Sequence, residues 1–186
     1  MRSILPENEN PLLRKKAKEI SAADIKSARI RTLITDMKKL LAKEEFGVAL
    51  AAPQVGESVR LFIVSGRALA RDSRNAPDEL EKKEEAPALP DQVYINPELS
   101  KLSRGKKDKH EGCLSIRGKW GEVPRAEKAT VRAYDEHGQR FTRGASGFLA
   151  HVFQHEMDHL EGILYTDKAS TLYDEQPHDE KALERK

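Results

Sequence analysis

The chain has 186 residues, of which 34% are charged and 38% hydrophobic, and its formal net charge is +2. This length suggests a single domain, and a net charge so close to zero does not favour general nucleic-acid binding. No stretch approaches the ~18 consecutive apolar residues of a membrane span, and residues 1–18 lack the apolar h-region of a secretory signal. The single cysteine, Cys113, excludes an internal disulfide bond and must be a core residue, a nucleophile or a metal ligand.

The first third of the chain predicts one amphipathic helix followed by a segment of small residues. We expect the helix from about Ala22 to about Glu44, because Ser21 to Asp24 fits a capping box and apolar residues recur behind it at helical spacing. The segment Gly47 to Gln54 is too rich in glycine and alanine for a good helix. It indicates either a backbone that closely approaches a ligand or a tightly packed strand.

Strands dominate the middle of the chain. Val59 to Val64 is apolar on both faces, which indicates a central strand, and Val93 to Pro97 predicts another. Between them, Ser65 to Asp91 contains three prolines and a run of mixed charges, so we expect a long insertion that is mobile or only locally helical. The basic stretch Lys101 to Lys109 is interpreted as a hairpin tip, with an RNA contact as the alternative.

The last third predicts a hairpin followed by a buried helix. Strands at Thr130–Tyr134 and Arg140–Arg143 flank a natural turn. Ser146 suits the N-cap of the helix and Gly162 its stop, and the apolar residues between them follow a three/four spacing. Strands that do not alternate regularly with helices indicate an α+β fold, with mostly antiparallel curved sheets packed around this central helix and an additional N-terminal helix.

The predicted central helix carries the pattern His-Glu-x-x-His at residues 155–159. Positions i and i+4 lie on one face of a helix, so His155 and His159 can aim two imidazoles at one metal ion. Glu156 stands beside them, where its carboxylate could take a proton from a metal-bound water. The alternative is a helix that carries two histidines by chance. It is disfavoured because burying them with a glutamate would be costly without a partner.

A catalytic site of the zinc type needs a third protein ligand. No acidic residue downstream of the helix stands in a matching motif, whereas Cys113 lies upstream in the stretch Glu111-Gly112-Cys113-Leu114-Ser115. The glycine beside it would let a thiolate reach a metal without steric conflict. A metal would also lower the pKa of a cysteine from its usual value of about 8.5. A small core residue and a catalytic nucleophile stay open as alternatives for Cys113.

Three stretches, together and in this order, resemble the peptide deformylases, which remove the formyl group from the initiator methionine of new polypeptides. They are GVALAAPQ at 47–54, EGCLS at 111–115 and QHEMDH at 154–159. The resemblance covers roughly Pro11 to Asp167, and the three motifs together are very specific. It implies one divalent metal ion per chain, held by Cys113, His155 and His159. Fe²⁺ is typical of the family, and Zn²⁺ or Ni²⁺ can substitute.

The resemblance also implies roles for residues that do not bind the metal. Glu156 matches the general acid/base, and the Gln54 side chain and the Leu114 backbone N–H match donors to the reaction's oxyanion. The residues at substrate-binding positions are Gly47, Val48, Gly112, Phe148, His151 and Val152. The two glycines and Val48 match contacts to the substrate backbone, and Val48 with the other three matches the apolar slot for the methionine side chain.

Two residues depart from the family's pattern, and one ion pair is expected to support it. His151 stands where an aliphatic residue is usual, so we expect a retained but altered preference at the methionine position. Ala49 stands where glycine is usual; it would be strained if that position required a positive φ, and we favour the reading that glycine there only allows close packing. Glu111 and Arg125 are expected to pair and fix the cysteine loop.

These observations predict one catalytic domain over residues 1–175, a mobile insertion at 65–91 and a polar C-terminal tail at 176–186. The expected partners are formyl-methionyl nascent polypeptides and, transiently, the ribosome. We expect a monomer that contacts neither DNA nor membrane, in a bacterial-type cytoplasm, with a processed organelle form as the alternative. A zinc endopeptidase built on the same helix is the alternative activity. A structural metal site, normally closed by four protein ligands, is the non-enzymatic alternative.

Overall fold

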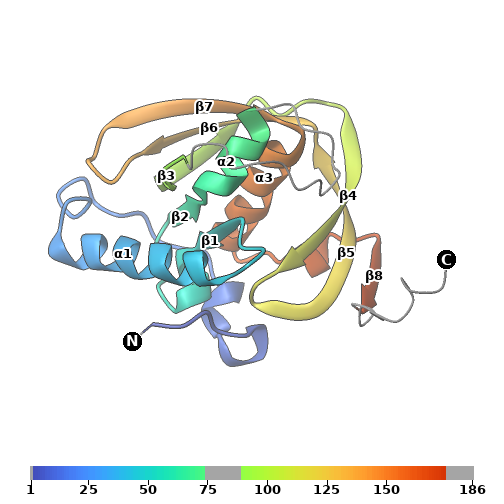
Figure 1. The fold of residues 1–186 in the computed structure, drawn as a ribbon, viewed down its shortest axis with the longest axis horizontal. Helices are drawn as coiled ribbons and strands as arrows, with labels where there is room; N and C mark the ends of the chain where they lie inside the picture. The colour runs from blue at the N-terminus through green and yellow to red at the C-terminus, as the bar shows by residue number, and fades with distance from the viewer. Residues whose placement is uncertain (1, 74–88, 175–186) are drawn as a thin grey trace.

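The computed structural model describes residues 2–73 and 89–174. It is an α+β fold in which two antiparallel sheets both contact one long helix, α3, as the sequence predicted (Figure 1). The helices are α1 (Ala28–Lys43), α2 (Gly66–Ser73) and α3 (Gly147–Glu161). The strands are β1 (Ala49–Ala51), β2 (Leu61–Val64), β3 (Gln92–Ser100), β4 (Lys106–Cys113), β5 (Ile116–Ala126), β6 (Lys128–Tyr134), β7 (Arg140–Ser146) and β8 (Thr171–Asp174).

The larger sheet has the order β1-β2-β3-β6-β7 and separates two apolar cores. Successive side chains of a strand point to opposite faces. Strand β2 therefore places Phe62 and Val64 in the core shared with α3, and Leu61 and Ile63 in the core shared with α1. Because both faces are covered, β2 is apolar throughout, and the prediction of a central strand is confirmed.

Helix α1 covers the sheet face opposite α3 with the predicted apolar stripe, but its predicted start was wrong. It begins at Ala28 and not near Ala22, because the Ser27 side chain provides the N-cap and accepts a hydrogen bond from the N–H of Ile30 at 3.3 Å. Ser21 and Asp24 form a separate turn upstream, in which the Asp24 N–H donates to Ser21 Oγ at 3.2 Å. Ser21 and Ser27 can thus each cap a helix, and the cap of α1 is Ser27.

The smaller sheet has the order β4-β5-β8 and corrects one prediction. Residues 101–109 are not a hairpin tip, because β3 pairs with β6 whereas β4 pairs with β5. The lysines at 106, 107 and 109 belong to β4 itself, and their charge suits its exposed end. Strand β8 was not predicted; it pairs Tyr173 with Trp120 of β5.

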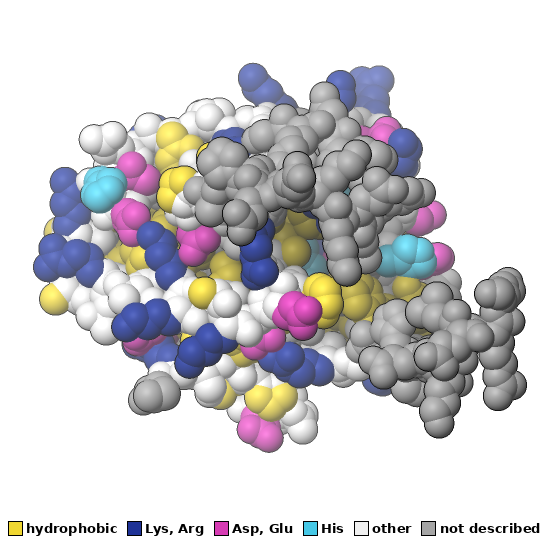
Figure 2. Space-filling view, viewed as in Figure 1, with side chains coloured by type: hydrophobic (Ala, Val, Ile, Leu, Met, Phe, Trp, Pro, Cys, Tyr) yellow, Lys and Arg dark blue, Asp and Glu magenta, His cyan; other side chains and the backbone are white. Residues whose placement is uncertain are grey.

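The remaining predictions about the chain's organisation divide between described and undescribed residues. The hairpin of β6 and β7 is confirmed, and Gly66–Ser73 of the predicted insertion is helix α2. Residues 74–88 and the tail at 176–186 lie outside the described residues, so mobility there stays a prediction. None of the helices in the described part of the chain is long and apolar enough to cross a membrane. Figure 2 shows acidic and basic side chains interspersed over one face, which agrees with a net charge of +2.

Candidate metal centre

Helix α3 presents its polar motif inside the protein because both sheets pack against it. Its C-terminus is set by Gly162, whose φ of 76° only glycine adopts without strain. The N–H of Ile163 then bonds the carbonyl of Asp158 at 2.9 Å, which closes the last turn. At the other end Ser146 occupies the N-cap position, although its side chain makes no capping hydrogen bond. The predicted limits of the helix are therefore confirmed.

Cys113, His155 and His159 converge on one point, as predicted. Their ligand atoms all lie within 4.8 Å of one another, and Cys113 Sγ is 3.3 Å from His159 Nε2. The two histidines lie one turn apart on α3, with ring centroids separated by 4.9 Å. Cys113 ends β4, and the pairing of β4 with β5 shifts register between Glu111 and Cys113. Such a bulge re-aims a side chain, and here it directs the sulfur toward α3.

This donor set fits a divalent transition metal. Around a tetrahedral metal, bonds of about 2.0–2.3 Å to sulfur and nitrogen place the ligand atoms about 3.5 Å apart. The distance of 3.3 Å between Cys113 Sγ and His159 Nε2 is close to this value. A thiolate with two imidazoles suits late first-row metals. The group comprises three candidate ligands among the described residues. A metal held by three protein ligands would keep one position open, as in catalytic sites.

The two imidazoles have opposite electrostatic environments. Burial alone would lower the pKa of His155, but hydrogen bonds to Cys113 and Glu111 outweigh it and raise that pKa well above its ordinary value. Burial, and then the neighbouring His155, lowers the pKa of His159 well below its ordinary value. His159 is therefore neutral and can offer a lone pair, whereas His155 occupies a site that attracts positive charge.

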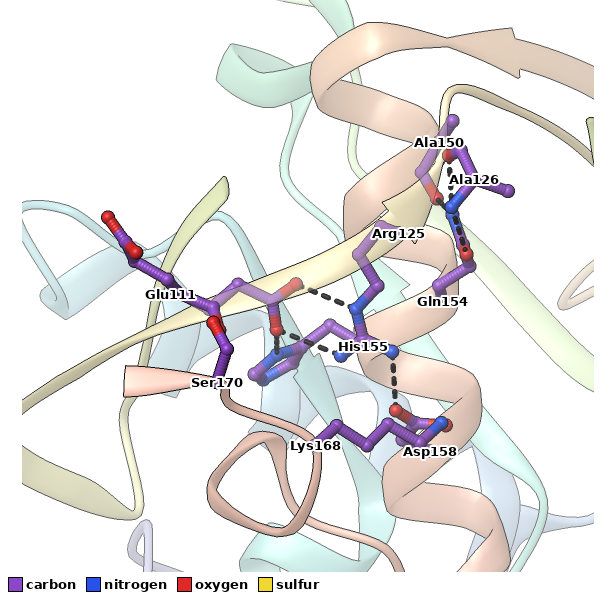
Figure 3. Close-up of polar contacts among 10 residues, drawn as sticks. Glu111, Arg125, Ala126, Ala150, Gln154, His155, Asp158, Lys168 and Ser170 are labelled. Atoms are coloured by element: carbon purple, nitrogen blue, oxygen red, sulfur yellow. Dashed lines mark hydrogen bonds and ion pairs between the residues drawn. The ribbon is translucent and has the colours of Figure 1, made fainter. Parts of the chain in front are cut away.

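Glu111 and Arg125 form the predicted ion pair, and the structure extends it (Figure 3). Arg125 donates Nε and Nη2 to the two carboxylate oxygens of Glu111 at 2.7 and 2.9 Å, and Glu111 Oε2 accepts from His155 Nδ1 at 2.9 Å. This leaves His155 Nε2 to face the metal position. On its other side Arg125 donates to Asp158 Oδ2 at 2.5 Å, and Lys168 donates to Asp158 Oδ1 at 2.6 Å. Sequence reasoning missed both of these partners.

The Glu156 carboxylate lies next to the candidate ligands and is almost fully buried. Its Oε2 has no hydrogen-bond partner among residues 2–73 and 89–174. Burial raises the pKa of Glu156 to about 7; the neighbouring His155 opposes this shift, and Glu111 adds to it. A carboxyl group with such a pKa can both accept and return a proton near neutral pH.

The side chain of Gln54 also reaches the candidate ligands. It lies in the short 3₁₀ helix Ala52–Val55 that follows β1. Its Oε1 accepts from the N–H of Ala51 at 2.8 Å, so its amide nitrogen is turned toward the site and lies 3.4 Å from Cys113 Sγ. Leu114 directly follows Cys113 in the turn between β4 and β5. Both predicted oxyanion donors are therefore neighbours of Cys113, Gln54 through a contact and Leu114 along the chain.

The predicted substrate-backbone positions lie at the start of β1 and near the end of β4. Gly47 and Val48 lead into β1, which is an edge strand of the larger sheet. Gly112 lies in β4 beneath the Trp120 ring, and a Cβ there would come within 3.3 Å of that ring. Ala49 pairs with a residue of β2 in ordinary strand geometry. Among described non-glycine residues a positive φ occurs at positions 96 and 101, so the strain considered for Ala49 does not arise.

The four residues predicted to form the methionine slot comprise three apolar side chains and one imidazole. Val48, Phe148 and Val152 pack in the core shared by the sheet and α3, and His151 is buried beside them on the same helix. The guanidinium of Arg71, on α2, lies 4.3 Å from the centre of the Phe148 ring. Part of the segment predicted as an insertion therefore borders this wall, which the sequence did not indicate.

Comparison with known proteins gives consistent matches. The model of the polypeptide deformylase family matches residues 1–175. The peptide deformylase of Desulforudis audaxviator is 37% identical over 164 residues, which are 88% of this chain and 91% of that protein. The Dehalococcoides mccartyi peptide deformylase is 38% identical over 179 residues, covering 95% and 91%. A Met-Ala-Ser-bound peptide deformylase structure from Acinetobacter baumannii superposes with a TM-score of 0.73 at 32% identity, covering 89% of this chain and 96% of that one.

Proposed function

The chain belongs to the polypeptide deformylase family, and from this premise we propose that it removes the N-formyl group from the initiator formyl-methionine of newly synthesised polypeptides. The observation that carries the proposal is the convergence of Cys113, His155 and His159 within 4.8 Å, beside the buried carboxylate of Glu156. The tripeptide bound by the Acinetobacter relative, Met-Ala-Ser, is what such a reaction would leave from formyl-Met-Ala-Ser. That correspondence supports the substrate class.

Cys113, His155 and His159 would hold one divalent ion, Fe²⁺ by preference, with Zn²⁺ or Ni²⁺ as substitutes. Bound there, the ion would act as a Lewis acid and lower the pKa of a water in its open position. The Glu111 carboxylate fixes the tautomer of His155 by accepting from Nδ1 at 2.9 Å. Such support usually strengthens metal binding and holds the ring in orientation.

Glu156 is proposed as the general acid/base. Water adds its oxygen to the formyl carbon, the bond between that carbon and the methionine nitrogen breaks, and formate leaves. Glu156 takes a proton from the attacking water and returns it to the departing amine. Its buried position, and a pKa raised by burial to about 7, suit a group that must perform both transfers.

Gln54 and Leu114 are proposed to stabilise the negative oxygen that develops on the formyl group. The Gln54 amide is preorganised, because the N–H of Ala51 holds its oxygen and turns its nitrogen toward the site. The backbone N–H of Leu114 would be the second donor. Losing one such donor costs about 3 kcal/mol in other enzymes, or roughly a hundredfold in rate.

The substrate is proposed to bind as an added strand. Gly47, Val48 and Gly112 would bond its backbone, which makes recognition tolerant of sequence beyond the first residue. Val48, Phe148, His151 and Val152 would surround the methionine side chain.

The test is formate release from formyl-Met-Ala-Ser by the Ni²⁺-loaded protein, beside Glu156→Gln with equal metal content. We expect formate from the wild type and a loss of about a thousandfold or more in the variant, since it removes the proton acceptor but keeps the size of the side chain. No formate from wild type carrying one metal ion per chain would overturn the proposal. Cleavage of internal peptide bonds in intact casein would favour the endopeptidase instead.

A further inference from the structure

The chain turns back after α3 and packs beside the candidate metal centre. Residues 163–174, called here the post-helix segment, comprise a short 3₁₀ helix at Tyr165–Asp167 and strand β8. Strand β8 pairs with β5, and the N–H of Ser170 donates to the carbonyl of Glu122 at 2.8 Å. Two side chains of this segment are connected to His155. Tyr165 contacts it directly, and Lys168 is linked to it through other charged side chains.

Tyr165 supports His155 by packing. Its side chain is 1% exposed, and its ring stacks on the imidazole with a centroid separation of 6.1 Å and an interplanar angle of 24°. The phenol donates to the carbonyl of Lys119 in β5 at 2.9 Å. This hydrogen bond to β5 fixes the Tyr165 ring against the imidazole of His155. Offset stacking at this distance is a normal aromatic contact.

Lys168 supports the same histidine through charge. Its Nζ bonds one oxygen of Asp158, and the other oxygen of Asp158 accepts from Arg125. Arg125 in turn donates hydrogen bonds to both carboxylate oxygens of Glu111, and Glu111 accepts a hydrogen bond from His155 Nδ1 (Figure 3). Cationic and anionic groups alternate along this row, so each one holds its neighbours by charge-assisted hydrogen bonds. The row runs from a lysine that is 41% exposed to a metal ligand in the interior.

We propose that Tyr165 and Lys168 are positioning residues for His155, and that docking of the post-helix segment is coupled to metal binding. Coupling of this kind is reciprocal: a docked segment strengthens metal binding, and bound metal strengthens docking by the same factor. The inference rests on the metal centre of the proposed function and adds a regulatory link to it.

Variants of the two residues test the first half of the coupling, with Co²⁺ affinity measured by chelator competition. Partners of metal-ligating histidines usually contribute about 10- to 100-fold to affinity. Lys168 acts on His155 through three intervening side chains, so we expect Lys168→Met to weaken Co²⁺ binding by about threefold to tenfold. Tyr165→Leu should weaken it by about tenfold, whereas Tyr165→Phe, which keeps the ring, should stay within twofold of wild type. The thiolate-to-cobalt absorption should shift in the weakened variants.

Lys16→Met is the matched control, because Lys16 also bonds a carboxylate of α3, Glu161 at 3.0 Å, outside the row that leads to His155. It should bind Co²⁺ as wild type does. Equal losses in Lys16→Met and Lys168→Met, or no loss in Lys168→Met and Tyr165→Leu, would overturn the proposal. Urea unfolding identifies any variant that fails to fold.

Hydrogen exchange in the wild-type protein tests the second half and needs no variant. The N–H groups of Lys168 and Ala169 donate to the carbonyl of Tyr165, and that of Ser170 donates to the carbonyl of Glu122 in β5. The hydrogen exchange of these three groups should slow at least tenfold with saturating Co²⁺. The N–H of Gly138, in the turn between β6 and β7, should not respond. Unchanged exchange at 168–170 would overturn the coupling alone. Failure of the wild type to bind Co²⁺ would instead overturn the metal centre and with it the proposed function.

Discussion

Replacing Glu111 by glutamine tests the role of the buried ion pair most directly. Glu111 is 8% exposed and accepts three hydrogen bonds, two from Arg125 and one from His155. Glutamine keeps the size of the side chain but replaces one acceptor oxygen by a donor NH₂ group. Its NH₂ must then face a donor of Arg125 or of His155. One buried donor loses its acceptor, and among residues 2–73 and 89–174 Arg125 keeps Asp158 alone as an ionic partner.

Two estimates of the cost agree. Breaking a buried ion pair from one side usually costs about 3–5 kcal/mol, and because Arg125 retains Asp158 we expect the lower end. Independently, burial would raise the pKa of Glu111, but Arg125 and then His155 lower it from 4.5 to about 2. A depression of this size corresponds to about 3 kcal/mol of stability at neutral pH. Because the pKa is lower in the folded state, this stability is present above about pH 5 and is lost as the pH falls toward 2.

The assay is urea unfolding of the metal-free protein at pH 7 and pH 4, with Glu122→Gln as control. Glu122 lies on β5 of the same sheet and is 3.9 Å from the exposed His110, so its variant should stay within about 0.5 kcal/mol of wild type. Glu111→Gln should be about 3 kcal/mol less stable at pH 7, and the difference should narrow by about 1 kcal/mol at pH 4. A difference below about 0.5 kcal/mol at pH 7, or one that does not narrow, would refute the reasoning.

Three further substitutions have defined outcomes. His151→Ile should change the ratio of turnover of formyl-methionyl to formyl-norleucyl peptides, because it removes the only imidazole among the four predicted slot residues; identical ratios would contradict this. Ala49→Gly should leave formate release unchanged and lower the free energy of unfolding by about 1 kcal/mol, as expected for glycine in a strand; a large gain in activity would show that alanine is strained. Gly162→Ala should destabilise more than Gly118→Ala in thermal unfolding. Both have φ near 75°, which costs about 1–2 kcal/mol, but only at Gly162 would the Cβ lie 2.9 Å from backbone atoms. Equal costs would show that the close contact relaxes.

The parts of the site that follow local periodicity could be predicted from the sequence. His155 and His159 share a face because helical geometry alone places i and i+4 together. Glu156 then follows from its position between them. The roles proposed for Cys113 and Gln54 needed the resemblance of separate motifs, because nothing local to either residue indicates that β4 and the segment after β1 meet α3.

Other features could not be predicted, because they depend on competition or on long-range contacts. The start of α1 is decided between caps at Ser21 and Ser27, each of which has the right side chain. Strand β8 has four exposed residues and no apolar alternation to mark it. Asp158 carries no signal beyond its place in the helical motif, and its two cationic partners come from β5 and from the post-helix segment.

The buried charges of Glu111, Arg125 and Asp158 also allow a test that separates stability from metal binding. Buried ionic groups are seldom better for stability than apolar groups of similar volume. Replacing all three together, as Glu111→Met, Arg125→Met and Asp158→Leu, removes the buried charges of the row and takes the partner from two further groups, Lys168, which is 41% exposed, and Nδ1 of His155. We therefore expect urea unfolding of the metal-free triple variant to be within about 1–2 kcal/mol of wild type, whereas each single change is more damaging. Co²⁺ affinity should still fall by about tenfold or more, because His155 loses the acceptor at Nδ1. A triple variant that binds Co²⁺ like wild type would show that the ion pairs do not orient the ligand; one that cannot fold would show that they are needed for the fold itself.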